Sequence, residues 1–125
     1  MYEDVLDFWF NDLSPQQWWV KDEKLDQEIA RRFSTLHAQA AHCELFDWRM
    51  AAKGRLAEII ILDQFSRNIY RDTPQAFATD SLALALAQEA LAVDADKALS
   101  PVERSFLYLP FMHIESAEIH KVAVI

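Results

Sequence analysis

The chain has 125 residues, a length that corresponds to one domain, and 52% of its residues are hydrophobic, enough for a substantial core. It carries 12 basic and 20 acidic residues, and its net charge of −8 argues against nonspecific binding to nucleic acid, which needs a positive field. A single Gly among many Ala, Leu, Glu, Gln and Arg residues argues against a β-rich domain and predicts an all-α fold.

The only cysteine, Cys43, excludes an internal disulfide. It falls on an apolar helix face, so we expect a small buried core residue there rather than a nucleophile. No apolar stretch approaches the roughly 20 residues that cross a bilayer, and the acidic N-terminus does not have the layout of a signal peptide. We therefore expect a cytoplasmic protein without membrane contact.

The N-terminal part is rich in aromatic residues. Residues 5–10 predict a short helix, and Ser14 followed by Pro15 predicts the start of another, with Ser as N-cap and Pro at the first helical position. We expect Trp18 and Trp19 to fix this second helix to the core; stacking on a ligand is the alternative.

The segment 22–42 has the clearest amphipathic pattern. His37 and His42 lie off its main apolar stripe, so we expect both to face solvent or to lie at the rim. The stripe recurs at spacings of three and four residues and consists of Leu25, Ile29, Phe33, Leu36, Ala40 and Cys43.

The next helix is predicted over 48–63 or a little beyond. Its second half is apolar nearly all round, which is typical of a helix at the centre of a domain. A short helical turn at 73–77 follows, and Asp80 is then expected to cap a helix over 81–93.

The last third predicts two more helices. Ser100 begins the first with a capping box. Pro110 lies inside it, and because an interior proline costs roughly 3 kcal/mol, we expect a break or kink there. A final helix is expected from about Ser116 and is still running at Ile125, so we expect a single helical domain that is truncated at its C-terminal end.

Polar side chains follow the buried apolar run 59–62. Asp63 and Arg67 stand four residues apart with the acid first, the favourable order for an ion pair on a helix. One interpretation is that Asp63, Arg67 and Asn68 tie the helix end to the following loop. The other is an anion site built around Arg67 and Arg71. The candidate ligand-binding residues are Gln64, Arg67, Asn68 and Arg71.

A second polar group follows Pro110. His113 beside a carboxylate can act as acid, base or metal ligand, although a hydrogen-bonded core histidine is the interpretation that we favour. His120 lies seven residues on, about 10.5 Å along a helix, so we predict no metal site. The candidate catalytic residues are Asp63, His113 and Glu115.

Common signatures are missing from the sequence. One Gly cannot form a phosphate-binding loop, one Cys argues against a structural zinc cluster, and no Gly-x-Ser-x-Gly motif occurs. We therefore predict no cofactor and exclude the usual nucleotide and hydrolase motifs.

Three blocks of the sequence, residues 5–10, 54–80 and 106–113 with Glu115, resemble the bacterial family called domain of unknown function 924. The middle block contains the stretch Leu-Asp-Gln-Phe-Ser-Arg-Asn-Ile-Tyr-Arg at 62–71. The resemblance implies an all-helical fold of tetratricopeptide-like antiparallel hairpins, and family members that continue for some tens of residues. It implies no activity.

Two functions fit these observations. The first, which the helical-hairpin architecture and the lack of a catalytic signature favour, is a binding or scaffold module in which a groove between helices holds a peptide, a protein or a second copy of the chain. The second is a small-molecule enzyme or anion-binding protein, with Arg67 and Arg71 holding an anionic group and His113 or Glu115 moving a proton. The second function requires Arg67, Asn68 and His113 to converge on one pocket that is open to solvent.

Overall fold

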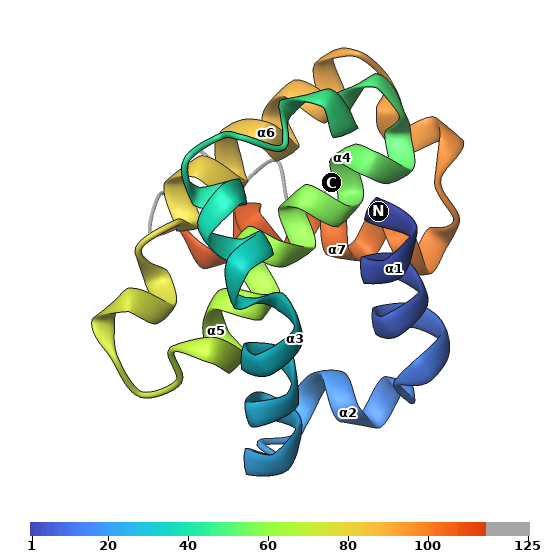
Figure 1. The fold of residues 1–125 in the computed structure, drawn as a ribbon. Helices are drawn as coiled ribbons and strands as arrows, with labels where there is room; N and C mark the ends of the chain where they lie inside the picture. Colours follow the sequence, from blue (N-terminus) through green and yellow to red (C-terminus); the bar gives the residue numbers. More distant parts are fainter. Residues whose placement is uncertain (115–125) are drawn as a thin grey trace.

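A computed structural model describes residues 1–114, and within that range the fold is all-α without strands (Figure 1). The predicted fold class is therefore confirmed. The α-helices are α1 Tyr2–Leu6, α2 Pro15–Trp19, α3 Glu23–Ala41, α4 Ala52–Ile60, α5 Ser66–Ile69, α6 Asp80–Ala92 and α7 Pro101–His113. Two π-helical segments, η1 Asp7–Asp12 and η3 Ile61–Phe65, and three 3₁₀ turns, η2 Phe46–Met50, η4 Pro74–Phe77 and η5 Ala95–Ala98, join them.

The helix α4 crosses the middle of the molecule and contacts α1, α6 and α7, as its all-round apolar sequence predicts (Figure 1). It begins later than expected, because Ala51 is extended and Trp48 belongs to η2 instead. The only glycine, Gly54, explains how η2 fits against α4. A Cβ at this position would lie 2.0 Å from the carbonyl oxygen of Trp48.

The helical run continues from α4 through η3 into α5. All five residues of the π-helical turn η3 are buried. The carbonyl oxygen of Leu62 accepts hydrogen bonds from the hydroxyls of Ser66 at 2.7 Å and Thr79 at 2.8 Å. These side chains satisfy a buried acceptor, as buried backbone groups require. A π-helical turn of this kind is frequently found at functional sites.

His37 is buried, contrary to the prediction that it faces solvent, whereas His42 is exposed as predicted. His37 lies four residues after Phe33 and three before Ala40, so it shares the buried face of α3. Its Nε2 lies 2.6 Å from the hydroxyl of Ser66. Burial lowers the pKa of His37, which favours a neutral ring in this position.

Cys43 is exposed, so its predicted place in the core is wrong. The helix α3 ends at Ala41, and Cys43 follows in the left-handed conformation with φ 60°. Backbone bonds from Cys43 to Ala40 and from Glu44 to Gln39 close the helix end in a Schellman motif. This turn ends the helical periodicity that had placed the cysteine on the apolar face.

The helix α7 runs through Pro110 without the expected break. Pro110 and the neighbouring Phe111 are buried, and Phe106 and Leu107 in the preceding turn are almost fully buried. Packing of this apolar face offsets the missing hydrogen bond of the proline. No helix within residues 1–114 is long and apolar enough to cross a membrane. Glu115 and the helix predicted from Ser116 lie outside the described residues.

Candidate functional site

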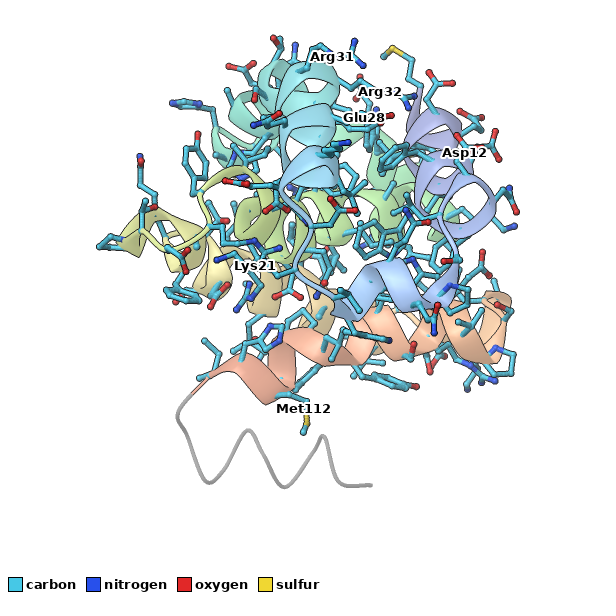
Figure 2. The ribbon with its side chains drawn as sticks, turned by 90° about the horizontal axis from the view of Figure 1, so that it is seen from below. Asp12, Lys21, Glu28, Arg31, Arg32 and Met112 are labelled. Atoms are coloured by element: carbon cyan, nitrogen blue, oxygen red, sulfur yellow. The ribbon has the colours of Figure 1, made fainter. Side chains whose placement is uncertain are left out.

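Three parts of the chain that are far apart in sequence meet around one cavity of about 190 Å³. They are the end of α2 with the segment before α3, the η3–α5 run, and the end of α7. Lys21 lies between the start of α3 and α7 in the view from below (Figure 2). The cavity is lined by Trp18, Trp19, Val20, Lys21, Gln64, Arg67, Asn68, Arg71 and His113.

The arrangement brings together His113 and all the residues expected to bind a ligand. Asp63 lies behind this wall and is 1% exposed. The side chains of Arg67, Arg71 and His113 are each between 23% and 30% exposed, so they are partly accessible to solvent. This is the convergence on one open pocket that the second function requires.

Arg67 is held from behind by two acids. Its guanidinium donates to both carboxylate oxygens of Asp80, at 2.9 and 3.0 Å, and Nη1 lies 3.4 Å from Oδ1 of Asp63. Nη1 also donates to the carbonyl oxygen of Asp63 at 2.6 Å. The predicted pair with Asp63 is present, but the two-point pair is with Asp80.

Asp80 therefore does not act as the helix cap predicted for it. It is the first residue of α6, and Thr79 occupies the N-cap position without a side-chain hydrogen bond. A carboxylate in the first turn of a helix still interacts favourably with the helix dipole. Here that carboxylate also fixes the orientation of Arg67.

Arg71 and Asn68 share a single acid from α3. Arg71 donates to both oxygens of Asp26, and the longer of these bonds, from Nη2, is 3.1 Å. The amide nitrogen of Asn68 donates to Oδ1 of Asp26 at 2.9 Å. Hydrogen bonding to Asp26 is the main cause that raises the pKa of Arg71. Both side chains are thus fixed before any ligand binds.

Asp63 and His113 form a second link between η3 and α7. Nδ1 of His113 lies 2.7 Å from Oδ1 of Asp63. The other carboxylate oxygen of Asp63 accepts from the side-chain amide of Gln64 at 2.8 Å. A buried carboxylate is satisfied in this way from several sides, and the histidine ring is held against the cavity.

The wall of the cavity is cationic, although the protein as a whole is acidic. Lys21, Arg67 and Arg71 line the cavity, and among residues 1–114 no Asp or Glu does so. The carboxylates that fix the two arginines lie in a second layer. Asp80 and Asp26 have side-chain exposures of 11% and 12%. A ligand in the cavity therefore meets the positive groups first.

An adjoining cavity of about 300 Å³ shares Lys21, Asn68 and Arg71 with the first. Acidic side chains line this second cavity, including Glu23, Asp26 and Asp72. Repulsion from these carboxylates makes it a poorer place for an anion. The smaller cavity is thus the better candidate for an anionic group.

Aromatic residues form the apolar side of the smaller cavity. Trp18 contacts Phe106 edge to face with ring centroids 4.9 Å apart, and its indole nitrogen donates to the carbonyl oxygen of Trp9. The expectation that Trp18 fixes α2 to the core is confirmed. Trp19 stacks on Phe106 but is 63% exposed, so most of this ring faces solvent beside the cavity.

Sequence reasoning missed two residues that complete the site from other elements. Asp26 stands 45 residues before Arg71, and Lys21 precedes α3. Only their charge could have signalled them, since no local pattern links them to 62–71. Within residues 1–114, no three His, Cys, Asp or Glu side chains are grouped closely enough to hold a metal ion.

Comparisons with known proteins agree with this fold. No curated protein matches the chain. A solved structure of a protein of unknown function from Agrobacterium tumefaciens, ATU0120, superimposes with a TM-score of 0.93 at 39% identity, over 98% of this chain and 69% of that one. The model of the family described as "Bacterial protein of unknown function (DUF924)" matches residues 5–125. The chain therefore belongs to the DUF924 family.

Proposed function

We propose that this protein binds a small anionic compound in the cavity between α2, α5 and α7. Of the two functions that the sequence leaves open, the geometry favours the second. The observation that carries the proposal is the wall itself: three cationic side chains, Lys21, Arg67 and Arg71, line one cavity, and no carboxylate of the described part of the chain lines it.

The prepared arginines support this function. Arg67 and Arg71 are each fixed by a two-point bond to a carboxylate behind them. A group that is already ordered loses less conformational entropy when a ligand binds. The guanidinium can still offer its remaining donors to a carboxylate or phosphate on the cavity side.

The size and the aromatic wall narrow the ligand class. Drug-sized ligands occupy cavities of roughly 300–1,000 Å³, and this one is about 190 Å³. Trp18 and Trp19 offer flat apolar surface beside the cationic groups. We therefore expect a compact ligand with one anionic group and an apolar or aromatic body.

Benzoate is a suitable probe, with uncharged benzamide as its matched control. We expect calorimetry or NMR titration to detect benzoate binding that weakens with salt, since exposed charges are screened. Benzamide should bind at least about tenfold more weakly, a difference of roughly 1.4 kcal/mol. Equal binding of the two probes, or no binding of benzoate, would overturn the proposal.

Two lysine variants locate the binding. Lys21 and Lys97 are both exposed and both pair with an exposed Asp on the surface, at 3.2 and 3.4 Å. Such pairs contribute little to stability, so either lysine can be replaced without unfolding the protein. Lys21→Met should weaken benzoate binding severalfold, whereas Lys97→Met should leave it unchanged. Equal effects of the two substitutions would place the binding elsewhere.

The C-terminus of a peptide that ends in an aromatic residue offers the same groups as benzoate, a carboxylate beside an aromatic ring. N-acetyl-phenylalanine and a longer acetylated peptide ending in phenylalanine distinguish the two sources. Preference for the short compound supports a small-molecule site. Preference for the longer peptide would instead favour the peptide-binding module that the helical architecture first suggests.

A further inference from the structure

The pair formed by Asp63 and His113 goes beyond what anion binding needs. Asp63 is almost completely buried, and its Oδ1 lies 2.7 Å from Nδ1 of His113. His113 itself lines the cavity and keeps 24% of its side chain exposed. An acid in the interior thus orients an imidazole that lines the cavity.

The geometry selects one tautomer of the neutral histidine. A carboxylate accepts hydrogen bonds and does not donate, so Nδ1 carries the proton in this pair. Nε2 is then an acceptor, and among residues 1–114 no hydrogen bond to Nε2 of His113 is present. A buried acid that orients a histidine in this manner makes its other nitrogen a general base.

The side chains around the Asp63–His113 pair are cationic, and removal of a proton from a ligand leaves negative charge on that ligand. Arg67 lies beside Asp63, and Arg71 and Lys21 line the same cavity wall as His113. Negative charge that develops on a ligand would face these cations in a partly enclosed space. Groups placed in advance at such a position stabilise the transition state without further reorganisation.

We propose that Asp63 and His113 form an acid–base pair that transfers protons to and from the anionic ligand of this pocket. The proposal rests on the proposed function. Nε2 of His113 takes a proton from a carbon or oxygen of the ligand, and the electron pair stays on the ligand, spread into a neighbouring carbonyl or carboxylate. Nε2 then returns the proton at the same or a conjugated position. The reaction class is an isomerisation by proton transfer, which needs no oxidant or co-reactant.

A chromogenic base-catalysed reaction tests this proposal without knowledge of the natural substrate. In 5-nitrobenzisoxazole, a base removes the C3–H proton of the isoxazole ring, the N–O bond breaks as the nitrile forms, and a coloured cyanonitrophenolate results. Its flat apolar body suits the tryptophan wall, and its phenolate product suits the cations. We expect turnover above that of free imidazole.

Variants assign the base. His113→Ala should lower the rate by at least about 100-fold, the usual contribution of a positioned general base. Added imidazole should restore part of that loss, which a purely structural histidine would not allow. His42→Ala is the matched control, since His42 is exposed and its ring contacts the carbonyl oxygen of Ala38 in its own helix end, and it should leave the rate unchanged.

Asp63 is a positioning residue in this scheme. Asp63→Asn puts an amide donor beside Nδ1, which moves the proton to Nε2 and removes the free base. We expect at least a tenfold lower rate, and ¹⁵N NMR should show the neutral ring of His113 protonated at Nδ1 in the wild type and at Nε2 in the variant. The wild-type spectrum requires no variant to fold.

The outcomes separate this inference from the proposed function. Benzoate binding without turnover of 5-nitrobenzisoxazole would overturn the acid–base pair and leave the binding pocket intact. The acid–base pair is also overturned, with the binding pocket left intact, if turnover persists in His113→Ala or if the neutral ring of His113 in the wild type carries its proton on Nε2. If the wild-type protein neither binds benzoate nor turns over 5-nitrobenzisoxazole, the proposed function itself is overturned.

Discussion

Arg49 and Arg67 each hold a buried carboxylate by a two-point bond, yet their surroundings differ. Arg49 donates to both oxygens of Glu58, at 2.9 and 2.8 Å, and Glu58 is 1% exposed. Arg67 holds Asp80 in the same way but also reaches Asp63 and lines a cavity with His113. A buried ion pair alone is therefore no sign of function. The extra acid, the histidine and the open wall distinguish the second region.

The two regions should also differ in what their arginines contribute to stability. Glu58 has no other charged partner within hydrogen-bond distance among the described residues. Asp63 keeps bonds to Gln64 and His113 if Arg67 is removed. The comparison can be tested by removing each arginine in turn.

Arg49→Met should cause the largest loss of stability. It leaves the carboxylate of Glu58 buried without its cation, which costs roughly 3–5 kcal/mol. Urea unfolding followed by circular dichroism measures this loss. The double variant Arg49→Met with Glu58→Met should recover most of it, because the unpaired charge is then gone. A loss below about 1 kcal/mol for the single variant would contradict the structural role.

Arg67→Met should cost less, about 2–3 kcal/mol, because Asp63 retains two partners and Asp80 is more exposed than Glu58. Benzoate binding should be lost in Arg67→Met and kept in Arg49→Met. The comparison fails if Arg67→Met is the more destabilising variant and both variants bind benzoate equally.

Gly54→Ala should destabilise the protein by about 1–3 kcal/mol, the usual range for overpacking. The new Cβ would lie 2.0 Å from the backbone oxygen of Trp48, so η2 must move away from α4 and disturb Arg49. Thermal unfolding measures the effect. At an exposed helix position, replacing Gly by Ala instead stabilises the protein. The reverse substitution Ala85→Gly, at an exposed position of α6, is therefore the reference and should lower the free energy of unfolding by about 1 kcal/mol. A more stable Gly54→Ala protein would contradict the close approach.

The smallest expected effect concerns pH. Burial lowers the pKa of His37 from its ordinary value of 6.5, so the unfolded chain takes up a proton more readily than the folded protein. The free energy of unfolding should therefore decrease as the pH falls below about 6.5. His37→Gln retains a hydrogen-bond donor for Ser66 and should flatten this part of the profile in urea unfolding at several pH values. Identical profiles would show that the ring is free to take up a proton in the folded state.

Much of this fold follows from local sequence patterns. Composition predicts the all-α class, and the start signals at Ser14 and Ser100 correspond to helices with capping boxes. The apolar run before Asp63 correctly predicts the central helix. These features depend on residues only a few positions apart, which a single sequence displays directly.

The errors arise where a local pattern is overridden by packing or by a turn. The spacing of His37 from Phe33 and Ala40 places it on the buried face, where Ser66 provides a partner. Cys43 follows a helix end that periodicity alone does not reveal. The apolar packing around Pro110 offsets the cost of a proline within α7.

The candidate site was predictable in part. The short segment 63–71 indicates a polar interior, since it contains five polar side chains that follow a buried apolar run: Asp63, Gln64, Arg67, Asn68 and Arg71. Their partners Asp26 and Asp80, and the lining residue Lys21, come from other elements. Side chains so distant in sequence are brought together only by tertiary structure, which the patterns of a single sequence do not show.

Tryptophan resonances offer the most direct test of the central claim that the cavity beside α2 is a ligand site. The indole N–H signals of Trp9, Trp18, Trp19 and Trp48 can be followed by NMR while benzoate is added. Trp18 and Trp19 line the cavity, whereas Trp48 lies in η2 and contacts Tyr2. We predict saturable shifts of Trp18 and Trp19 with Trp48 unchanged. Shifts of Trp48 as large as theirs, or no shift at all, would contradict the account.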